Sequence, residues 1–214
     1  MLNVKKIECN MLQENCYIVS DNTNQCVIID CGAYYTEEQQ AIITYIKENN
    51  LKPIHLLATH GHLDHNFGNG FIEEVFSLRP AIHEDDSNKL ENLNQQAKDF
   101  FGMQTNLKEP KPEKILHDKD IISFGNHQLK VLHTPGHSAG SVAYLCEEEK
   151  IIFTGDTLFR HSIGRTDFKD GSMFAIIQSL RMLSQLPDDI KVYPGHGLST
   201  TIGEEVAHNP YLDR

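Results

Sequence analysis

The stretch Thr59-His60-Gly61-His62-Leu63-Asp64-His65 carries three imidazoles and one carboxylate within seven residues. Such side chains stay in water or pair with a partner, because burying an unpaired polar or charged group costs free energy. A single histidine is more often a surface or hydrogen-bonded residue, but this density favours a shared partner. A divalent metal ion is such a partner, since imidazole nitrogens and carboxylate oxygens are its usual ligands. The stretch therefore predicts a metal site.

The residues just before this stretch predict where the site lies in the fold. Residues 54–58 form an apolar run, with Leu56 and Leu57 at its centre, that is typical of a buried strand. The histidines and Asp64 would then lie on the loop that leaves this strand. Functional groups are disproportionately found on such loops, which a rigid scaffold positions.

Short strands and helices alternate along the rest of the chain. Strands are predicted at 4–9, 16–20, 26–30, 54–58, 80–83, 121–124, 128–133, 141–145, 151–154 and 190–193. Helices are predicted at 36–49, 67–78, 84–100 and 172–186. The strands come in two batches with interspersed helices, so we expect two sheets covered by outer helices.

Composition narrows the possible partners and the compartment. The 214 residues predict one domain, 1–214, and the net charge of −11 disfavours nucleic acid and anionic membrane surfaces. The N-terminal segment lacks the apolar core of a signal peptide, which favours a cytoplasmic location. The five cysteines are an odd number without a CxxC pair, so we expect buried free thiols. The sequence makes no prediction of oligomeric state.

Three further polar residues follow predicted strands, and a glycine directly precedes each of them. These residues are His137, Asp156 and His196, in the segments Pro135-Gly136-His137, Gly155-Asp156-Thr157 and Pro194-Gly195-His196. A glycine lets the backbone come close to a crowded centre. Each residue alone is an ordinary turn residue, but together with the histidine stretch they predict a larger ligand set.

In this order, the seven residues resemble the metal-ligand positions of the metallo-β-lactamase-fold hydrolase superfamily. The resemblance covers nearly the whole chain and implies an α/β fold, a four-layer αββα sandwich. It implies that His60, His62 and His137 bind one divalent metal ion and that Asp64, His65 and His196 bind a second. Asp156 would bridge the two ions. Zinc is the expected metal, with iron or manganese as alternatives.

Residues that differ among the branches of the superfamily indicate which branch this chain resembles. His65 and Asp156 replace the Arg and Cys of many true β-lactamases, which disfavours antibiotic hydrolysis. The segments around His137, Asp156 and His196 look like glyoxalase II, or hydroxyacylglutathione hydrolase, which hydrolyses the thioester of S-lactoylglutathione. In that chemistry, paired metals lower the pKa of a shared water to give the attacking hydroxide, and Asp64 would orient it or accept its proton.

The resemblance is to a short glyoxalase-II-like subgroup. The chain ends soon after His196, so we expect no C-terminal helical glutathione-binding domain. Arg165 either binds a substrate carboxylate or is a structural residue that pairs with Asp167 or a backbone carbonyl. Asp30 either anchors the histidine loop by hydrogen bonds or merely starts a turn.

Three other functions compete with the hydrolase. Gly164-Arg165-Thr166-Asp167-Phe168 also looks like a stretch of the persulfide dioxygenases, which would hold a single iron with His60, His137 and Asp156. The segment around His196 follows the hydrolase pattern more closely and favours the hydrolase. Nuclease action is disfavoured by the net charge. A non-catalytic binding protein is disfavoured by the complete set of ligand residues.

Overall fold

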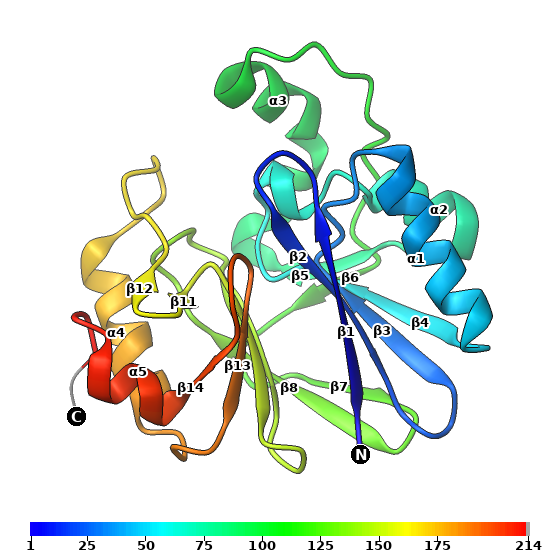
Figure 1. Ribbon diagram of the computed structural model, residues 1–214. Coiled ribbons are helices and arrows are strands. Elements are labelled where there is room, and N and C mark those ends of the chain that lie inside the picture. The colour runs from blue at the N-terminus through cyan, green and yellow to red at the C-terminus, as the bar shows by residue number, and fades with distance from the viewer. Residues whose placement is uncertain (213–214) are drawn as a thin grey trace.

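Two six-stranded sheets pack face to face in the computed structural model, which describes residues 1–212 (Figure 1). The first sheet runs in the order β1 (Asn3–Cys9), β2 (Glu14–Ser20), β3 (Gln25–Ile29), β4 (Lys52–Leu57), β5 (Pro80–His83), β6 (Lys114–Leu116). The second runs in the order β14 (Thr200–Thr201), β13 (Lys191–Pro194), β10 (Ile151–Gly155), β9 (Val142–Cys146), β8 (His127–His133), β7 (Ile121–Phe124). A small hairpin joins β11 (Leu158–Phe159) to β12 (Ser162–Ile163).

Helices cover the outer face of each sheet. The helices α1 (Thr36–Glu48) and α2 (Asn69–Phe76) pack on the first sheet, and α4 (Met173–Ser184) and α5 (Ile202–His208) pack on the second (Figure 1). A 3₁₀ segment, η2 (Glu84–Asn92), leads into α3 (Leu93–Phe101). The loop after β4, which carries the histidine stretch, contains a short 3₁₀ turn, η1 (Leu63–His65). The expected αββα sandwich is therefore confirmed.

The alternation of side chains along each strand explains the layers. In β2, Tyr17 and Val19 point between the sheets, whereas Cys16 and Ile18 point toward the helices. Every residue of this strand is buried, because a sheet covered on both faces has no solvent side. Phe153 of β10 lies in the layer between the sheets, with its ring stacked on Tyr193 at 5.2 Å between centroids.

The directions of the strands place the loops that carry the predicted ligand residues at one edge of the sandwich. In the second sheet, β8 and β10 are both antiparallel to β9, and β10 is parallel to β13. The carboxyl ends of β8, β10 and β13 therefore lie at the same edge. Two hydrogen bonds connect this sheet to the loop after β4, from Tyr144 Oη to Ala58 O and from Val142 N to Thr59 O.

Most predicted elements are present, and the differences have local causes. The predicted helix 84–100 is a 3₁₀ segment followed by an α-helix. At its start His83 Nδ1 accepts from Asp85 N and Ser87 Oγ donates to Glu84 O, local side-chain bonds of the kind that compete with helical backbone bonds. The predictions missed β6, β14, α5 and the β11–β12 hairpin, which are too short to show a periodic pattern.

The five cysteines are buried free thiols, as expected. In residues 1–212, no helix has the length and apolar character needed to cross a bilayer.

The layer between the sheets should carry much of the stability. Phe153→Ala should lower the free energy of unfolding by about 3–5 kcal/mol, because it leaves a cavity beside Tyr17 and Tyr193. Phe174→Ala is the matched control: that ring is 76% exposed on α4, and its loss should change stability by about 0.5 kcal/mol or less. Urea unfolding monitored by circular dichroism measures both. Equal losses in the two variants would contradict this description of the core.

Candidate metal centre

Four loops bring all seven predicted residues to one place. The loop after β4 supplies four of them, and the loops after β8, β10 and β13 supply one each. Their ligand atoms form three overlapping groups within 4.8 Å: His60, His62 and His137; His60, His65 and Asp156; and Asp64, His65 and His196. The sequence spacing thus identified side chains that are neighbours in the fold.

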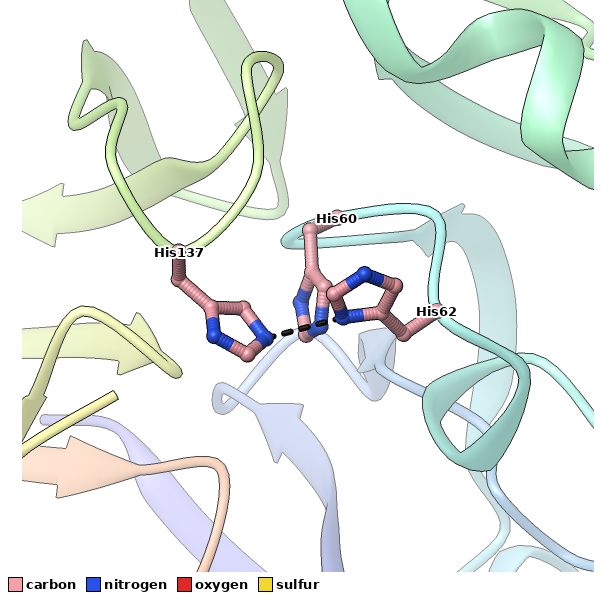
Figure 2. A group of neighbouring side chains, drawn as sticks. All are labelled: His60, His62 and His137. Carbon is pink, nitrogen blue, oxygen red and sulfur yellow. Dashed lines mark hydrogen bonds between the residues drawn. The ribbon is translucent and has the colours of Figure 1, made fainter. Parts of the chain in front are cut away.

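The first group consists of three histidines whose rings point toward one another (Figure 2). His62 Nδ1 lies 2.8 Å from His137 Nε2, and the ring centroid of His60 lies 4.7 Å from that of His62. All three side chains are buried. Three ring nitrogens that face a common point form a set that could hold one metal ion.

The second group lies next to the first. His196 Nε2 is 3.3 Å from Asp64 Oδ2, and His65 Nε2 is 3.7 Å from the same oxygen. Asp156 lies between the two groups, with Oδ1 3.3 Å from His65 Nε2 and Oδ2 3.5 Å from His137 Nε2. A carboxylate with one oxygen toward each group has the placement that a bridging ligand requires.

Hydrogen bonds fix which nitrogen each ring presents to the centre. His137 Nδ1 donates to the carbonyl of Arg165 at 2.9 Å, and His196 Nδ1 donates to the carbonyl of Leu12 at 3.1 Å. His65 Nδ1 donates to Asp30 Oδ2 at 2.9 Å. In the neutral form of each ring the lone pair is therefore on Nε2, which faces the centre. This arrangement of outer acceptors is typical of metal-ligating histidines.

Asp30 anchors the loop after β4 by hydrogen bonds, which is one of the two roles that the sequence predicted for it. Its carboxylate accepts from Thr59 N and Thr59 Oγ1, both at 2.7 Å, as well as from His65. Because the Thr59 hydroxyl donates to Asp30, its oxygen can accept from His60 Nδ1, 3.1 Å away. One buried carboxylate thus orients two ligand rings.

Three buried atoms at the centre make no hydrogen bond within residues 1–212: His60 Nε2, His65 Nε2 and Asp156 Oδ1. Unpartnered buried polar atoms are rare and costly in native proteins. All three belong to the predicted ligand set, and their nitrogen and oxygen chemistry suits divalent ions such as zinc, iron or manganese. The residues present therefore fit a metal centre.

The electrostatics of the site also suit metal ligands. Burial, assisted by neighbouring histidines, lowers the pKa of His60 well below its usual value and that of His62 to about 4, so both rings are neutral. Burial, the largest single effect, would raise the pKa of Asp156, but the adjacent His65, His137 and His196 together outweigh it and lower that pKa. Burial would likewise lower the pKa of His65, but the carboxylates around it, led by Asp156 and Asp64, raise that pKa well above its usual value.

Glycine is required where the backbone approaches the centre. A Cβ at Gly195 would collide with Asp156 Oδ1 and would lie 2.6 Å from His65 Cε1. Gly155 has a φ of +48°, and a Cβ there would collide with Thr59. These contacts explain why glycine precedes Asp156 and His196 in the sequence.

Asp86, which the sequence reasoning missed, ties two ligand loops together. Its fully buried carboxylate accepts from Gly61 N at 2.7 Å, between His60 and His62. It also accepts from Ser138 Oγ at 2.7 Å and from Gly140 N at 2.9 Å, next to His137. Lys89 pairs with it at 2.9 Å. The sequence carried no signal for this role, because Asp86 lies in a polar stretch that resembles an ordinary surface helix.

Glu14 is a second buried carboxyl group that the sequence reasoning missed. Its Oε2 accepts from Gly32 N at 3.2 Å, and its Oε1 lies 4.0 Å from His65 Nδ1. Burial raises its pKa well above the usual value. Its backbone also forms a β-bridge with His196. Glu14 therefore lies behind the second group of ligand candidates and connects β2 to the His196 loop.

A pocket of about 530 Å³ opens over the centre. Its floor includes His62, Asp64, His137, Asp156 and His196, and Arg165 lies on its wall. Arg165 pairs with Asp167 through two parallel hydrogen bonds, Nε to Oδ1 at 2.6 Å and Nη2 to Oδ2 at 2.7 Å. The structural pairing is thus present, and Nη1 of the same guanidinium has no part in it.

The family follows from a comparison of sequences. The sequence profile of the Metallo-beta-lactamase superfamily matches residues 9–196, which is most of the chain. The chain belongs to this superfamily. A curated relative, hydroxyacylglutathione hydrolase GloC of Haemophilus influenzae, is 35% identical over 215 residues and is aligned over 99% of both proteins. With its His and Asp clusters, the superfamily fold implies a metal-dependent hydrolase that binds divalent metal.

Solved structures share the fold over almost the entire chain. The B3 metallo-beta-lactamase BLEG-1 is 33% identical with a TM-score of 0.89, and 99% of each chain is covered. TTHA1623, crystallised in a di-iron-bound form, is 34% identical with a TM-score of 0.86, covering 98% of this superfamily member and 100% of that chain. ETHE1 from Myxococcus xanthus is 28% identical with a TM-score of 0.79, covering 97% and 83%.

Loss of the Asp86 charge should loosen the metal centre. In Asp86→Asn, an amide NH₂ replaces one of the two oxygens and faces a backbone donor, either Gly61 N or Gly140 N, so we expect about 2–3 kcal/mol of lost stability and 10–100-fold weaker metal binding. Asp85→Asn changes the neighbouring, half-exposed carboxylate and should alter neither quantity. Urea unfolding and metal titration of the apoprotein measure the two effects. Unchanged metal affinity in Asp86→Asn would show that the two loops hold their places without this carboxylate.

Metal binding should release protons. Because its pKa is raised, His65 holds a proton at neutral pH in the metal-free protein, and a metal ion at Nε2 must displace it. Apparent metal affinity should therefore fall about tenfold for each pH unit below neutrality. Titration calorimetry in buffers of different ionisation enthalpy counts the released protons. Binding without proton release at pH 7 would contradict this assignment.

Proposed function

We propose that the chain is a dinuclear-metal thioester hydrolase acting on S-lactoylglutathione or a related small thioester. The observation that carries the proposal is a set of three buried atoms that make no hydrogen bond within residues 1–212: His60 Nε2, His65 Nε2 and Asp156 Oδ1, which lie on both sides of the centre. The likeness to hydroxyacylglutathione hydrolase GloC supports the reaction class.

The proposed ligand sets follow the two side-chain groups. His60, His62 and His137 would hold one ion, and Asp64, His65 and His196 would hold the other. Asp156 would bridge them, because its two oxygens face different groups. We propose zinc as the resident metal, with iron or manganese as alternatives, and a relative of known structure binds two iron ions.

The proposed chemistry is hydrolysis of the acyl–sulfur bond. Bound divalent ions would lower the pKa of water and stabilise negative charge on the thioester oxygen. Asp64, a floor residue whose pKa is lowered by His65 and by a hydrogen bond from His196 against the effect of burial, is ionised and can accept the water's proton. A carbon–oxygen bond forms, the carbon–sulfur bond breaks, and the thiolate leaves with little need for protonation.

Other features of the molecule fit this proposal. We propose that Nη1 of Arg165 contacts a carboxylate of the substrate, while Asp167 holds the rest of the guanidinium in place. The buried free thiols fit a reducing compartment, so we propose that the protein acts in the cytoplasm. The net charge of −11 favours a small-molecule substrate over nucleic acid.

The alternative is a persulfide dioxygenase with a single iron held by His60, His137 and Asp156. The structural likeness to ETHE1 supports it, but at 28% identity this likeness is weaker than those to GloC and TTHA1623. The second group of ligand candidates, with His196 3.3 Å from Asp64, would have no role in a one-iron enzyme.

A substrate panel separates these functions. We expect hydrolysis of S-lactoylglutathione or of a coenzyme A thioester, complete loss of activity on chelation, and recovery on adding metal. His62→Ala should lower kcat/KM at least a hundredfold, because it removes one proposed ligand, whereas His55→Ala, which only contacts the carbonyl of Ser123, should not change it. Oxygen uptake with glutathione persulfide and no thioester cleavage would overturn the proposal. Hydrolysis of a β-lactam alone would also overturn it.

A further inference from the structure

We infer that the pocket over the metal centre selects thioesters by an apolar acyl group larger than lactoyl, which Phe100 and Phe168 recognise. The inference rests on the proposed thioesterase function and names its substrate class. Six apolar side chains line the pocket together with the ligand candidates: Leu12, Leu63, Phe100, Phe101, Phe159 and Phe168. A binding site of this composition favours apolar groups, which leave water on entering it.

Phe168 forms the wall next to the reacting position. Its ring lies 4.5 Å from the ring of His62 and 5.5 Å from that of His137, measured between centroids. The Arg165 guanidinium lies over the ring at 4.4 Å from its centroid. An acyl group whose carbonyl carbon is held at these histidines therefore extends along an aromatic surface.

Phe100 continues this surface toward solvent. It packs edge-on against Phe168 with centroids 5.7 Å apart, and 55% of its side chain is exposed. The helix that carries it, α3, is held in place by the buried residues Leu93 and Ala97, so the position of the exposed ring is fixed. A large aromatic side chain left half in water at the mouth of a catalytic pocket gains free energy when a ligand covers it.

Two charged side chains near the mouth are already paired: Asp167 takes two donors of Arg165, and Lys89 pairs with both Asp86 and Asp170. The two phenyl rings offer no hydrogen-bonding group to the hydroxyl of a lactoyl group, whereas added methylenes gain free energy from burial against them. An adjoining hollow of about 490 Å³ shares Phe100 and Phe168 with this pocket and adds Asn88, Asn92 and Lys169, which provide polar contacts for the thiol carrier.

A series of glutathione thioesters tests the inference, because the thiol carrier stays constant while the acyl group changes. We would measure kcat/KM for acetyl, lactoyl, butyryl and hexanoyl glutathione, each divided by its uncatalysed hydrolysis rate. Each buried methylene should raise the ratio about twofold to fourfold, so hexanoyl should exceed acetyl at least tenfold. A ratio that is flat, falls with chain length or is highest for lactoyl would overturn the inference.

Variants assign the selectivity to the aromatic wall. Phe100→Ala should lower the hexanoyl-to-acetyl ratio about fivefold, and Phe100→Leu, which keeps an apolar side chain, should retain most of the ratio. Phe174→Ala removes an exposed ring far from the pocket lining and should leave the ratio unchanged. An unchanged ratio in Phe100→Ala would overturn the role of this residue.

The outcomes distinguish this inference from the proposed function. Hydrolysis of every thioester without chain-length selectivity contradicts the apolar acyl site and leaves the thioesterase intact. Hydrolysis of none of them by the metal-loaded protein contradicts the thioesterase itself, and the acyl site with it.

Discussion

Burial of imidazoles and carboxylates that lack hydrogen-bond partners is the constraint on which this structure depends. His60, His65 and Asp156 each keep one buried atom without a hydrogen bond in residues 1–212, which costs free energy unless another species satisfies those atoms. Hydrogen bonds from the Nδ1 atoms of His65, His137 and His196 point outward from the centre, toward Asp30 and the carbonyls of Arg165 and Leu12. The Nε2 atoms of these three rings therefore face the inner side, as metal coordination requires.

The sandwich provides the rigidity that this arrangement needs. The seven clustered side chains come from loops of both sheets, so the two sheets must keep a fixed relative position, and the apolar layer around Phe153 and Tyr144 holds them. Two buried carboxylates then fix the positions of the loops. Asp30 orients the histidine rings of the loop after β4, and Asp86 joins that loop to the loop after β8. Packing sets the layers, and these few hydrogen bonds set the geometry of the centre.

The sequence predicted that these seven side chains lie together, because the chemistry that marks them is local. The dense histidine stretch, and the glycines before Asp156 and His196, reflect constraints that act within a few residues. Asp86, Glu14 and Phe100 could not be predicted in this way, since their roles come from contacts with residues distant along the chain. Likewise, β6 and β14 form by pairing with a neighbouring strand. They could not be predicted, because a segment of two or three residues is too short to show a periodicity of its own.

The central claim is a centre of two metal ions that share Asp156. Anomalous diffraction from crystals of the metal-loaded protein tests it most directly, because it locates each ion independently of activity. We predict two peaks about 3.5–4 Å apart, one among His60, His62 and His137 and one among Asp64, His65 and His196. A single peak at full metal loading, with Asp64 and His196 uncoordinated, would contradict the dinuclear centre and favour the one-iron alternative.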